Sequence, residues 1–337
     1  MSAMFDFTLS QPVPASAPRL QGYDVIIVGG GPGGFTAGLY AARARLSALL
    51  IEKGVPGGQA AVTSHIENYP GFPEGMDGPE LGQRMRDQAV SFGLEIVSAD
   101  VTQVTLDGDL KLAHTDQGVF QAKALIVATG TQSTALGVPG EQELRGRGVS
   151  YCATCDGAFF RDQTVAVVGG GDSAIDETLF LTRFVKEAVV IHRRDALRAT
   201  RILQDRAFAN PKIRFMWDTV VDQVFGEQTV QGLVVRNVKT GVQTTLAVNG
   251  VFVYVGMNPN TALLGDVLKL DDRGYIVANE EMATSVPGIF AAGDVRVKSL
   301  RQVVTACADG AIAAVNADRY IQEQEQERQR SAATSRT

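Results

Sequence analysis

The sequence contains little cysteine and little histidine, and it has no excess of basic residues. Its three cysteines and three histidines among 337 residues are too few for a disulfide scaffold. They also offer no second pair of ligands for a zinc site beside Cys152 and Cys155, so we expect no metal. The formal net charge of −6 leaves no large basic field, which argues against binding to nucleic acid.

Long apolar runs are also missing. None approaches the roughly 20 residues that span a bilayer. The N-terminal segment lacks the basic region and apolar core of a secretory signal. These absences predict a cytoplasmic enzyme that does not enter a membrane.

Glycine, in contrast, is abundant, with 36 residues, and two glycine turns share the same design. Residues 23–44 contain an apolar strand, a glycine turn and an Ala/Leu-rich helix, and residues 164–184 repeat this pattern. Such units build doubly wound parallel sheets. Because the length suits two domains, the repeat predicts an α/β fold. It would contain two Rossmann-like, three-layer dinucleotide-binding domains.

The order of the segments predicts that the second domain is inserted into the first. A short strand and a helix in residues 262–321 would complete the first dinucleotide-binding domain, which residues 23–133 begin. Residues 134–261 then form a second dinucleotide-binding domain, which carries the cysteine pair. Gly, Pro, Asn and Thr at both crossings suit a hinge. Residues 1–22 are predicted to be a flexible arm, and residues 322–337 a polar tail whose first part extends a helix and whose end frays.

The first glycine turn has the spacing of a dinucleotide fingerprint. Gly29 allows the tight turn, Gly31 lets backbone amides approach a pyrophosphate, and Gly34 permits close packing of helix on strand. Glu52 ends the next apolar strand, where an acid accepts hydrogen bonds from a ribose 2′-hydroxyl. The alternative is a sharp turn with a surface glutamate. Strand, turn, helix and acid are in register, which favours dinucleotide binding.

The second turn has no acid at the corresponding position. Gly169 and Gly171 match Gly29 and Gly31, and Ala174 replaces the third glycine, as the motif tolerates. The next strand ends in a basic cluster, where guanidinium groups can pair with the 2′-phosphate that an acid would repel. A solvated basic loop is the alternative, but the position favours NADP over NAD. The cluster consists of His192, Arg193, Arg194 and Arg198, and Asp195 within it is predicted to cap a turn.

Two turns require two ligands, and we assign FAD to the first. Asp294 follows Gly293 at the end of a short apolar strand, where it can meet the hydroxyls of a ribityl chain. Ala128, Thr129 and Gly130 form a turn after another apolar strand. Together with the N-terminal fingerprint, these turns predict a flavoprotein with NADPH at the second glycine turn.

Cys152 and Cys155 are separated by two residues at the start of the predicted inserted domain. That spacing allows a small disulfide ring that opens and closes readily. Zinc would need more ligands and a structural disulfide is unusual in a cytosolic enzyme, so redox chemistry is favoured. Asp156 is predicted to exchange protons with the leaving thiol, to cap a helix, or both. Cys307, in an Ala-rich helical pattern, is predicted to be a buried small residue.

These segments resemble the bacterial low-molecular-weight thioredoxin reductases. The resemblance rests on YCATCDGAFF, VVGGGDSA, HRRD with Arg198, and GIFAAGDV ahead of RQVVTACADGAIAA, and it covers nearly everything between Tyr23 and Tyr320. It implies a homodimer that passes hydride from NADPH to FAD, opens the disulfide and reduces thioredoxin. It also implies that Cys155 lies against the flavin and that Cys152 attacks thioredoxin. The inserted domain would rotate on its two connecting strands.

The same resemblance implies further cofactor contacts. At the flavin these are Lys53, Gly57, Gly58, Gln59, Asn68, Arg301, Gln302 and Val303; at NADPH they are Asp172 and Ser173.

Several alternatives share part of this pattern. The flavoprotein subunit of an alkyl hydroperoxide reductase normally has an added thioredoxin-like module, and related ferredoxin–NADP reductases lack the CxxC. A flavin dithiol oxidase would not need the basic cluster. A redox-sensing protein would need neither a hydride donor nor a relay. A reductase of another small redoxin remains open as well.

Overall fold

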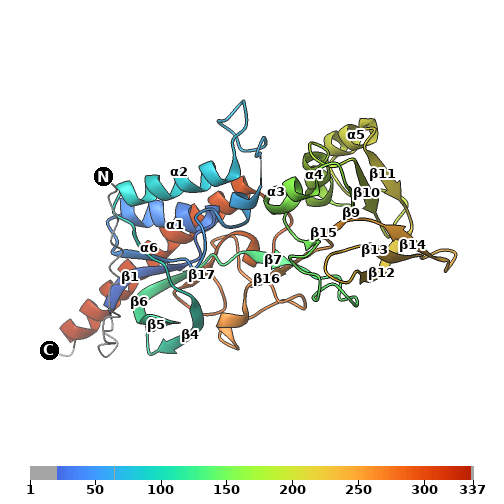
Figure 1. The fold of residues 1–337 in the computed structure, drawn as a ribbon. Coiled ribbons are helices and arrows are strands. Elements are labelled where there is room, and N and C mark those ends of the chain that lie inside the picture. Colours follow the sequence, from blue (N-terminus) through green and yellow to red (C-terminus); the bar gives the residue numbers. More distant parts are fainter. Residues whose placement is uncertain (1–20, 64, 335–337) are drawn as a thin grey trace, which may run out of the picture.

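The chain folds into two lobes joined by a pair of short strands (Figure 1). The computed structural model describes residues 21–63 and 65–334. The first lobe comprises residues 21–130 and 260–334, and the second residues 134–256. The predicted arm lies outside the described residues, except that Gln21 and Gly22 open the first strand instead of belonging to the arm. Within the described ranges, every helix is too short or too polar to span a bilayer.

Seven strands form one sheet in the first lobe, and its centre is parallel. β1 pairs with β2 and β6, with Ile27 opposite Leu50 and Ile126. The paired segments 25–28, 48–51 and 124–127 of these strands are continuous runs of Val, Ile, Leu and Ala, as expected for strands covered on both faces. Antiparallel β5 and β4 extend the sheet beyond β6. The strands are β1 (Gln21–Val28), β2 (Ala48–Ile51), β3 (Glu95–Val97), β4 (Val101–Asp107), β5 (Leu110–Thr115), β6 (Gly118–Val127) and β17 (Ile289–Ala291).

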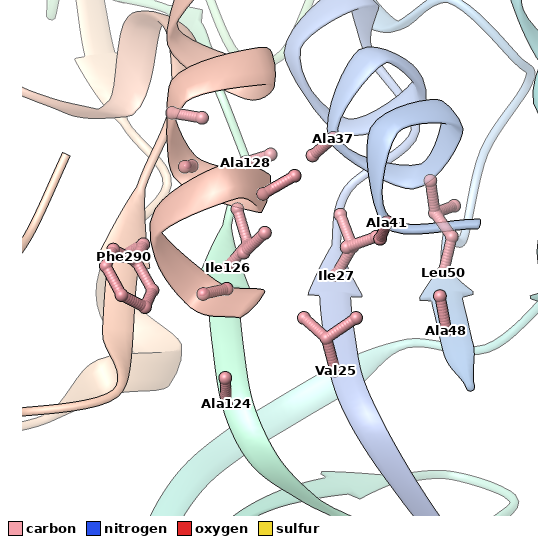
Figure 2. Close-up of a cluster of buried hydrophobic side chains, with 14 of the residues drawn as sticks. Val25, Ile27, Ala37, Ala41, Ala48, Leu50, Ala124, Ile126, Ala128 and Phe290 are labelled. Carbon is pink, nitrogen blue, oxygen red and sulfur yellow. The ribbon is translucent and has the colours of Figure 1, made fainter. Parts of the chain in front are cut away.

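Helices cover one face of this sheet. Figure 2 shows Ala37 and Ala41 of α1 packed over Val25 and Ile27 of β1. α6 lies beside α1, and a Cβ at Gly310 would collide with the backbone oxygen of Gly33. The two helices therefore approach each other backbone to backbone. The helices are α1 (Pro32–Arg43), α2 (Gly78–Ser91) and α6 (Val303–Thr334), with 3₁₀ turns η1 (Gly58–Val62), η3 (Ala262–Leu264) and η4 (Gly293–Val295).

The opposite face carries a second core cluster. Its buried residues come from β4 and β5, including Val104 and Ala113, and from the segment after the lobe crossing, including Leu264 and Ile276. The third layer of this lobe is thus built from strands and loops instead of helices. The sheet is still covered on both faces, which its apolar strands require.

α6 runs further than the sequence pattern predicted. The predicted extension of this helix into the polar segment from residue 322 is confirmed, and the helix continues to Thr334, where we expected a fraying end. Two ion pairs hold its polar part to the sheet, Glu325 with Lys123 at 2.6 Å and Arg328 with Asp109 at 3.1 Å. Polar contacts of this kind carry no apolar period, so the pattern did not reveal them. The last three residues lie outside the described part.

The lobes are connected by β7 (Thr131–Ser133) and β16 (Met257–Pro259), which pair in an antiparallel ladder. Asn260 ties this connection to the first lobe, because its amide donates to the Gly130 oxygen at 3.0 Å. The side chain of Asn260 also donates to the Thr129 oxygen at 2.9 Å. The two segments that connect the lobes therefore lie side by side where they leave the first lobe, next to Gly130 and Asn260.

The second lobe repeats the plan of the first with a five-stranded, all-parallel sheet in the order β11-β10-β9-β15-β8. A three-stranded antiparallel sheet packs on one face and α4 and α5 on the other. The elements are β8 (Val149–Ser150), α3 (Ala153–Asp156), η2 (Gly157–Phe160), β9 (Thr164–Gly169), α4 (Asp172–Leu181), β10 (Glu187–Ile191), α5 (Arg201–Ala209), β11 (Ile213–Met216), β12 (Thr219–Phe225), β13 (Gly232–Asn237), β14 (Gln243–Ala247) and β15 (Gly250–Tyr254). Strand, glycine turn and helix recur in both lobes, so the predicted α/β class with two Rossmann-like units is confirmed.

Candidate functional site

The first glycine turn lies between the end of β1 and the start of α1. Gly29 has φ +109°, and a Cβ there would collide with the backbone oxygen of Ala128. A Cβ at Gly34 would collide with the backbone oxygen of Gly29, whereas nothing lies within 4 Å of a Cβ built at Gly31. Packing therefore requires two of the glycines, and the third leaves open space beside the first amides of α1. Those amides form the positive end of the helix dipole, which suits a phosphate.

Glu52 reaches back from the end of β2 to this turn. Its Oε2 atom accepts a hydrogen bond from the Gly30 amide at 2.5 Å, and its Oε1 atom accepts one from the Gly54 amide at 2.6 Å. The structure thus brings the acid and the turn together. Lys53 points elsewhere and pairs with Asp100 at 3.3 Å.

The bend at Gly57 and Gly58 lies against the same turn. The Gly57 amide donates to the Gly30 oxygen at 2.8 Å. A Cβ built at Gly58 would lie 3.3 Å from the Cα of Gly31. The predicted second segment of the flavin site is therefore adjacent to the fingerprint.

Side chains from distant segments complete this cluster. Gln59 Nε2 donates to the Thr131 oxygen at 3.2 Å, next to the turn formed by residues 128–130. Asn68 Nδ2 donates to Gln302 Oε1 at 2.9 Å, and Val303 follows as the first residue of α6. Residues separated by more than 200 positions in the sequence thus lie side by side.

Gly293 and Asp294 follow β17 and face the start of α1. A Cβ built at Gly33 would lie 3.6 Å from the Gly293 nitrogen. The Oδ1 atom of Asp294 is buried and has no hydrogen-bond partner among the described residues. Burial raises the pKa of this carboxyl, and the nearby cations Lys298 and Arg301 oppose that rise. Buried carboxylate oxygens normally have donors, so this atom suits a ligand hydroxyl.

These features fit a flavin dinucleotide. The open space at Gly31 suits a pyrophosphate, Glu52 stands where a ribose would lie, and the orphaned oxygen of Asp294 suits a polyhydroxyl chain. No group of three or more His, Cys, Asp or Glu side chains in the described ranges is placed to hold a metal ion.

The second turn, between β9 and α4, has the same backbone plan. A Cβ built at Gly169 would lie 2.5 Å from the Tyr254 oxygen and 2.7 Å from the Cβ of Ala174. Nothing lies within 4 Å of a Cβ built at Gly171. Neighbouring atoms therefore pack closely against Gly169, whereas the space beside Gly171 is open, as binding of a pyrophosphate requires.

The segment after β10 is tied to this turn. The Arg198 amide donates to the Gly170 oxygen at 2.7 Å, and the Thr200 amide donates to Asp172 Oδ1 at 2.6 Å. The side chain of Asp172 thus holds protein backbone, while Ser173 is exposed at the helix start. These bonds place the basic cluster beside the glycine turn.

Three arginines of the cluster are free to bind an anion. Arg193, Arg194 and Arg198 are exposed, and within the described residues no hydrogen bond or ion pair involves their guanidinium groups. Asp195 does not neutralise them, because it pairs with Lys239 at 3.3 Å.

His192 has a different place from these arginines. It is 5% exposed, and a Cβ at Gly170 would lie 2.5 Å from its ring. Burial lowers the pKa of the imidazole, and Arg198 lowers it further. The structure therefore places a buried imidazole ring behind the turn.

Cys152 and Cys155 form a disulfide at the start of α3, with their Cα atoms 5.4 Å apart. The Cys155 amide donates to Cys152 Sγ at 3.1 Å, and the Cys152 amide donates to Ser150 Oγ at 3.0 Å. Cys152 is half-buried, with its sulfur 4.0 Å from the Val62 oxygen of the first lobe, whereas Cys155 is exposed. The predicted pair is thus formed and lies where the lobes meet.

Asp156 is half-buried and occupies the N-cap position of the following 3₁₀ turn, but its side chain makes no capping hydrogen bond there. The expectation for Cys307 requires correction. Cys307 is a free cysteine that is only half-buried, 3.7 Å from the Tyr69 hydroxyl, because α6 leaves this side partly open. It lies in the first lobe and does not join the pair.

The sequence analysis missed a polar cluster beneath the cysteine turn. Tyr254 accepts a hydrogen bond from the Ala153 amide at 2.8 Å. Thr154 Oγ1 and Glu177 Oε2 are buried without hydrogen-bond partners among the described residues. Burial raises the pKa of Glu177 to about 7, and Asp176 adds to the rise. The adjacent acids in an otherwise apolar helix were the only indication in the sequence.

Comparison with known proteins places the chain in a family. A family model described as pyridine nucleotide-disulphide oxidoreductase matches residues 23–310. The thioredoxin reductase of Listeria monocytogenes is 49% identical over 302 residues, which cover 89% of this chain and 94% of that protein.

Two solved structures share this likeness. The thioredoxin reductase of Lactococcus lactis in its FR conformation has a TM-score of 0.88 and 47% identity, covering 89% of this chain and 99% of that one. That of Streptococcus pyogenes is 50% identical, covers 90% of this chain and 100% of that one, and has a TM-score of 0.61. The chain therefore belongs to the pyridine nucleotide-disulphide oxidoreductase family and, within it, to the low-molecular-weight bacterial thioredoxin reductases.

Proposed function

We propose that the chain is an NADPH-dependent thioredoxin reductase that holds FAD at the first glycine turn and NADPH at the second. The position of the cysteine pair carries this proposal. Cys152 and Cys155 belong to the lobe with the second turn, yet Cys152 Sγ lies 4.0 Å from the Val62 oxygen of the lobe with the first. When bound, FAD would supply the two-electron chemistry that links NADPH to this disulfide.

At the first site the protein binds and orients the cofactor. The α1 amides near Gly31 would hold the pyrophosphate and Glu52 the ribose. Asp294 would accept a hydrogen bond from the ribityl chain, which would satisfy its buried oxygen. The neighbouring contacts would come from Gly57, Gly58, Gln59, Asn68, Ala128, Thr129, Gly130, Arg301, Gln302 and Val303. Lys53, paired with Asp100, would contribute through its backbone.

At the second site the three exposed guanidinium groups would select the 2′-phosphate. Arg193, Arg194 and Arg198 stand at the strand end where an NAD-binding protein carries an acid. His192 would support the turn from behind instead of binding the phosphate. Asp172 would hold the loop, and Ser173 would lie at the helix start.

The cysteine pair would carry the electrons onward by dithiol–disulfide exchange. Opening the Cys152–Cys155 bond takes two electrons and two protons. Cys152 thiolate would then attack one sulfur of oxidised thioredoxin and release the other as a thiolate. Cys155 thiolate would attack Cys152 in turn, which re-forms the disulfide and releases reduced thioredoxin. Asp156, half-buried beside the pair, would donate and accept the protons.

Both cofactor chemistry and thioredoxin binding require the second lobe to change its position, as the resemblance implies. The β7–β16 ladder is the only backbone connection between the described parts of the lobes. Two solved relatives of similar identity give TM-scores of 0.88 and 0.61. Such a difference supports lobes that keep their fold and alter their arrangement.

A homodimer in the cytoplasm completes the proposal. Tyr40 of α1 and Val304, Ile312 and Val315 of α6 are apolar side chains that remain 38–41% exposed. They supply apolar surface on the first lobe for a second copy. Sedimentation equilibrium of the purified protein tests the dimer.

The decisive experiment follows NADPH oxidation by the purified yellow protein with oxidised thioredoxin. Turnover should require thioredoxin, both cysteines and NADPH, and Cys152→Ser and Cys155→Ser should abolish it. Flavin reduction without thioredoxin turnover would redirect the search to another redoxin or to oxygen. A purified protein without flavin would refute the proposal.

A further inference from the structure

Asp309, on α6, is a buried carboxylate of the first lobe that accepts several hydrogen bonds. It is 5% exposed. Its Oδ2 atom accepts hydrogen bonds from the Gly293 amide at 3.0 Å, from Arg296 Nε at 2.9 Å and from Lys298 Nζ at 2.7 Å. Its Oδ1 atom accepts a further bond from Arg296 Nη2 at 3.0 Å. One carboxylate thus binds three groups of the segment 293–298.

This cluster has no role in joining the lobes or in forming the core. Burial works against the charge of Asp309, but the hydrogen bonds of Arg296 and Lys298 hold its pKa below the ordinary value. Buried ion pairs of this kind add little net stability compared with an apolar replacement. What the cluster does achieve is geometric, because it binds the turn from the side of α6. Ile276 holds the following residues from the other side, where its amide donates to the Val295 oxygen at 3.0 Å.

The fixed turn is the one that carries Asp294. The Gly293 amide, bonded to Asp309, immediately precedes it, and Gly293 has φ +77°. A Cβ built at Gly33 would lie 3.2 Å from the Ala306 oxygen of α6 and 3.6 Å from the Gly293 nitrogen. The turn is therefore held between α6 and the start of α1, with the orphaned Asp294 oxygen beside it.

We propose that Asp309 is a positioning residue of the flavin site, which acts by holding the Gly293–Asp294 turn at the start of α1. The inference rests on the proposed function, since it names the residue that orients one of its predicted cofactor contacts. Asp309 itself touches no cofactor. Its carboxylate acts through the Gly293 amide, and Arg296 and Lys298 keep that carboxylate charged.

Reconstitution of the apoprotein with FAD tests the proposal without reference to turnover. The dissociation constant is measured by flavin fluorescence at a temperature at which each apoprotein is folded. Asp309→Asn should weaken FAD binding about tenfold, because a charged acceptor of several hydrogen bonds is lost. Asp309→Leu, which also leaves the Gly293 amide without an acceptor, should weaken it further.

Two further variants separate positioning from general destabilisation. Asp222→Asn removes a carboxylate of the second lobe that is less buried than Asp309 but also binds an arginine, Arg236, through two hydrogen bonds at 2.9 and 3.0 Å. It should leave FAD affinity unchanged. The triple variant Arg296→Met/Lys298→Met/Asp309→Leu removes all three buried charges, so it should fold even if the single variants do not. It should still bind FAD at least about tenfold more weakly than the unmodified chain.

The outcomes are distinct. A folded triple variant with unchanged FAD affinity would overturn the role of Asp309. If Asp222→Asn lost as much FAD affinity as Asp309→Asn, the loss would reflect lower global stability. The proposed role of Asp309 would then be overturned as well. If the unmodified chain bound no FAD, the proposed function would fail first.

Discussion

Both glycine turns join a parallel strand to a helix, but the residue at the end of the next strand differs between them. At the first turn Glu52 bonds directly to the Gly30 amide at 2.5 Å. At the second turn His192 packs behind Gly170, and three exposed arginines lie in front. In the proposed function the backbone plan is shared because both turns would bind a pyrophosphate, and the side chains differ because the two nucleotides would differ at the ribose.

The helices that follow the turns differ as well. α1 has no acidic residue in its first turn, whereas α4 begins with Asp172 and also carries Asp176 and Glu177. Asp172 is occupied by the Thr200 amide, and Glu177 lies beneath the cysteine pair. The acid nearest the proposed phosphate site is thus bonded by the protein itself, through the Thr200 amide. In the proposed function the second lobe combines nucleotide binding with thiol chemistry, whereas the first lobe binds a nucleotide only.

The largest effect should come from a variant that stops thiol chemistry but leaves nucleotide binding intact. Cys155→Ser should reduce thioredoxin-dependent NADPH oxidation to background, since no intramolecular disulfide can form. Flavin reduction by NADPH should persist, because both glycine turns are intact. Stopped-flow absorbance of the flavin, beside steady-state turnover, measures both. Loss of flavin reduction in this variant would contradict the assignment of the two tasks.

The next largest effect should come from the arginines that follow the second glycine turn, where the ribose 2′-phosphate is proposed to bind. The triple variant Arg193→Met/Arg194→Met/Arg198→Met should lower kcat/KM for NADPH about a hundredfold or more, since hydrogen bonds to a charged group contribute about 1.5–3 kcal/mol each. The value for NADH should change little. Arg214→Met, which removes an arginine paired with Glu187 on the same lobe, is the control. Equal losses with both nucleotides would exclude a 2′-phosphate site.

At the first turn the corresponding test is Glu52→Ala. It removes the acceptor of the Gly30 and Gly54 amides and of the proposed ribose. FAD affinity should fall about tenfold, measured by reconstitution of the apoprotein. NADPH affinity, measured by titration, should stay unchanged. If the variant lost affinity for NADPH instead, the assignment of FAD to the first turn and NADPH to the second would have to be reversed.

Glu177 should make the second lobe sensitive to pH in a way that the first is not. Its pKa is raised to about 7 by burial, so the folded state favours the protonated form. Its contribution to stability is therefore full below the unfolded pKa, near 4.5, and is lost as pH rises toward 7. Glu177→Gln should gain stability relative to the unmodified chain by about 2.5 kcal/mol between pH 5 and pH 8, because each unit of pKa shift corresponds to about 1.4 kcal/mol. Thermal unfolding at both values measures this, and a constant difference would place Glu177 in water.

The smallest effect concerns the contact between the lobes. Arg206 of the second lobe pairs with Glu67 of the first at 2.8 Å, and both are exposed. Exposed pairs contribute at most about 1 kcal/mol, so Glu67→Gln should shift the population of this arrangement no more than about fivefold. Distance measurements between one label on each lobe would detect the shift. Arg206→Met should give the same shift, and the double variant should add nothing.

Several side-chain positions lay beyond what the sequence could predict. The buried carboxyls of Glu177 and Asp309 follow no periodic pattern, because each depends on partners from other segments of the chain. The separation of His192 from its neighbouring arginines depends on the packing of one ring against Gly170. The continuation of α6 to Thr334 depends on ion pairs with the sheet. Sequence patterns report local periodicity and cannot report such contacts.

By itself, the sequence determined the repeated strand–turn–helix unit, the α/β class and the cysteine pair, because each is encoded within a few tens of adjacent residues. Tertiary structure alone decided which distant segments meet. It brought Asn68 to Gln302, Asp294 to the start of α1, and the cysteine pair to the edge of the first lobe. The physical reason is that hydrogen bonding and burial act between residues that are close in space, however far apart they are in the chain.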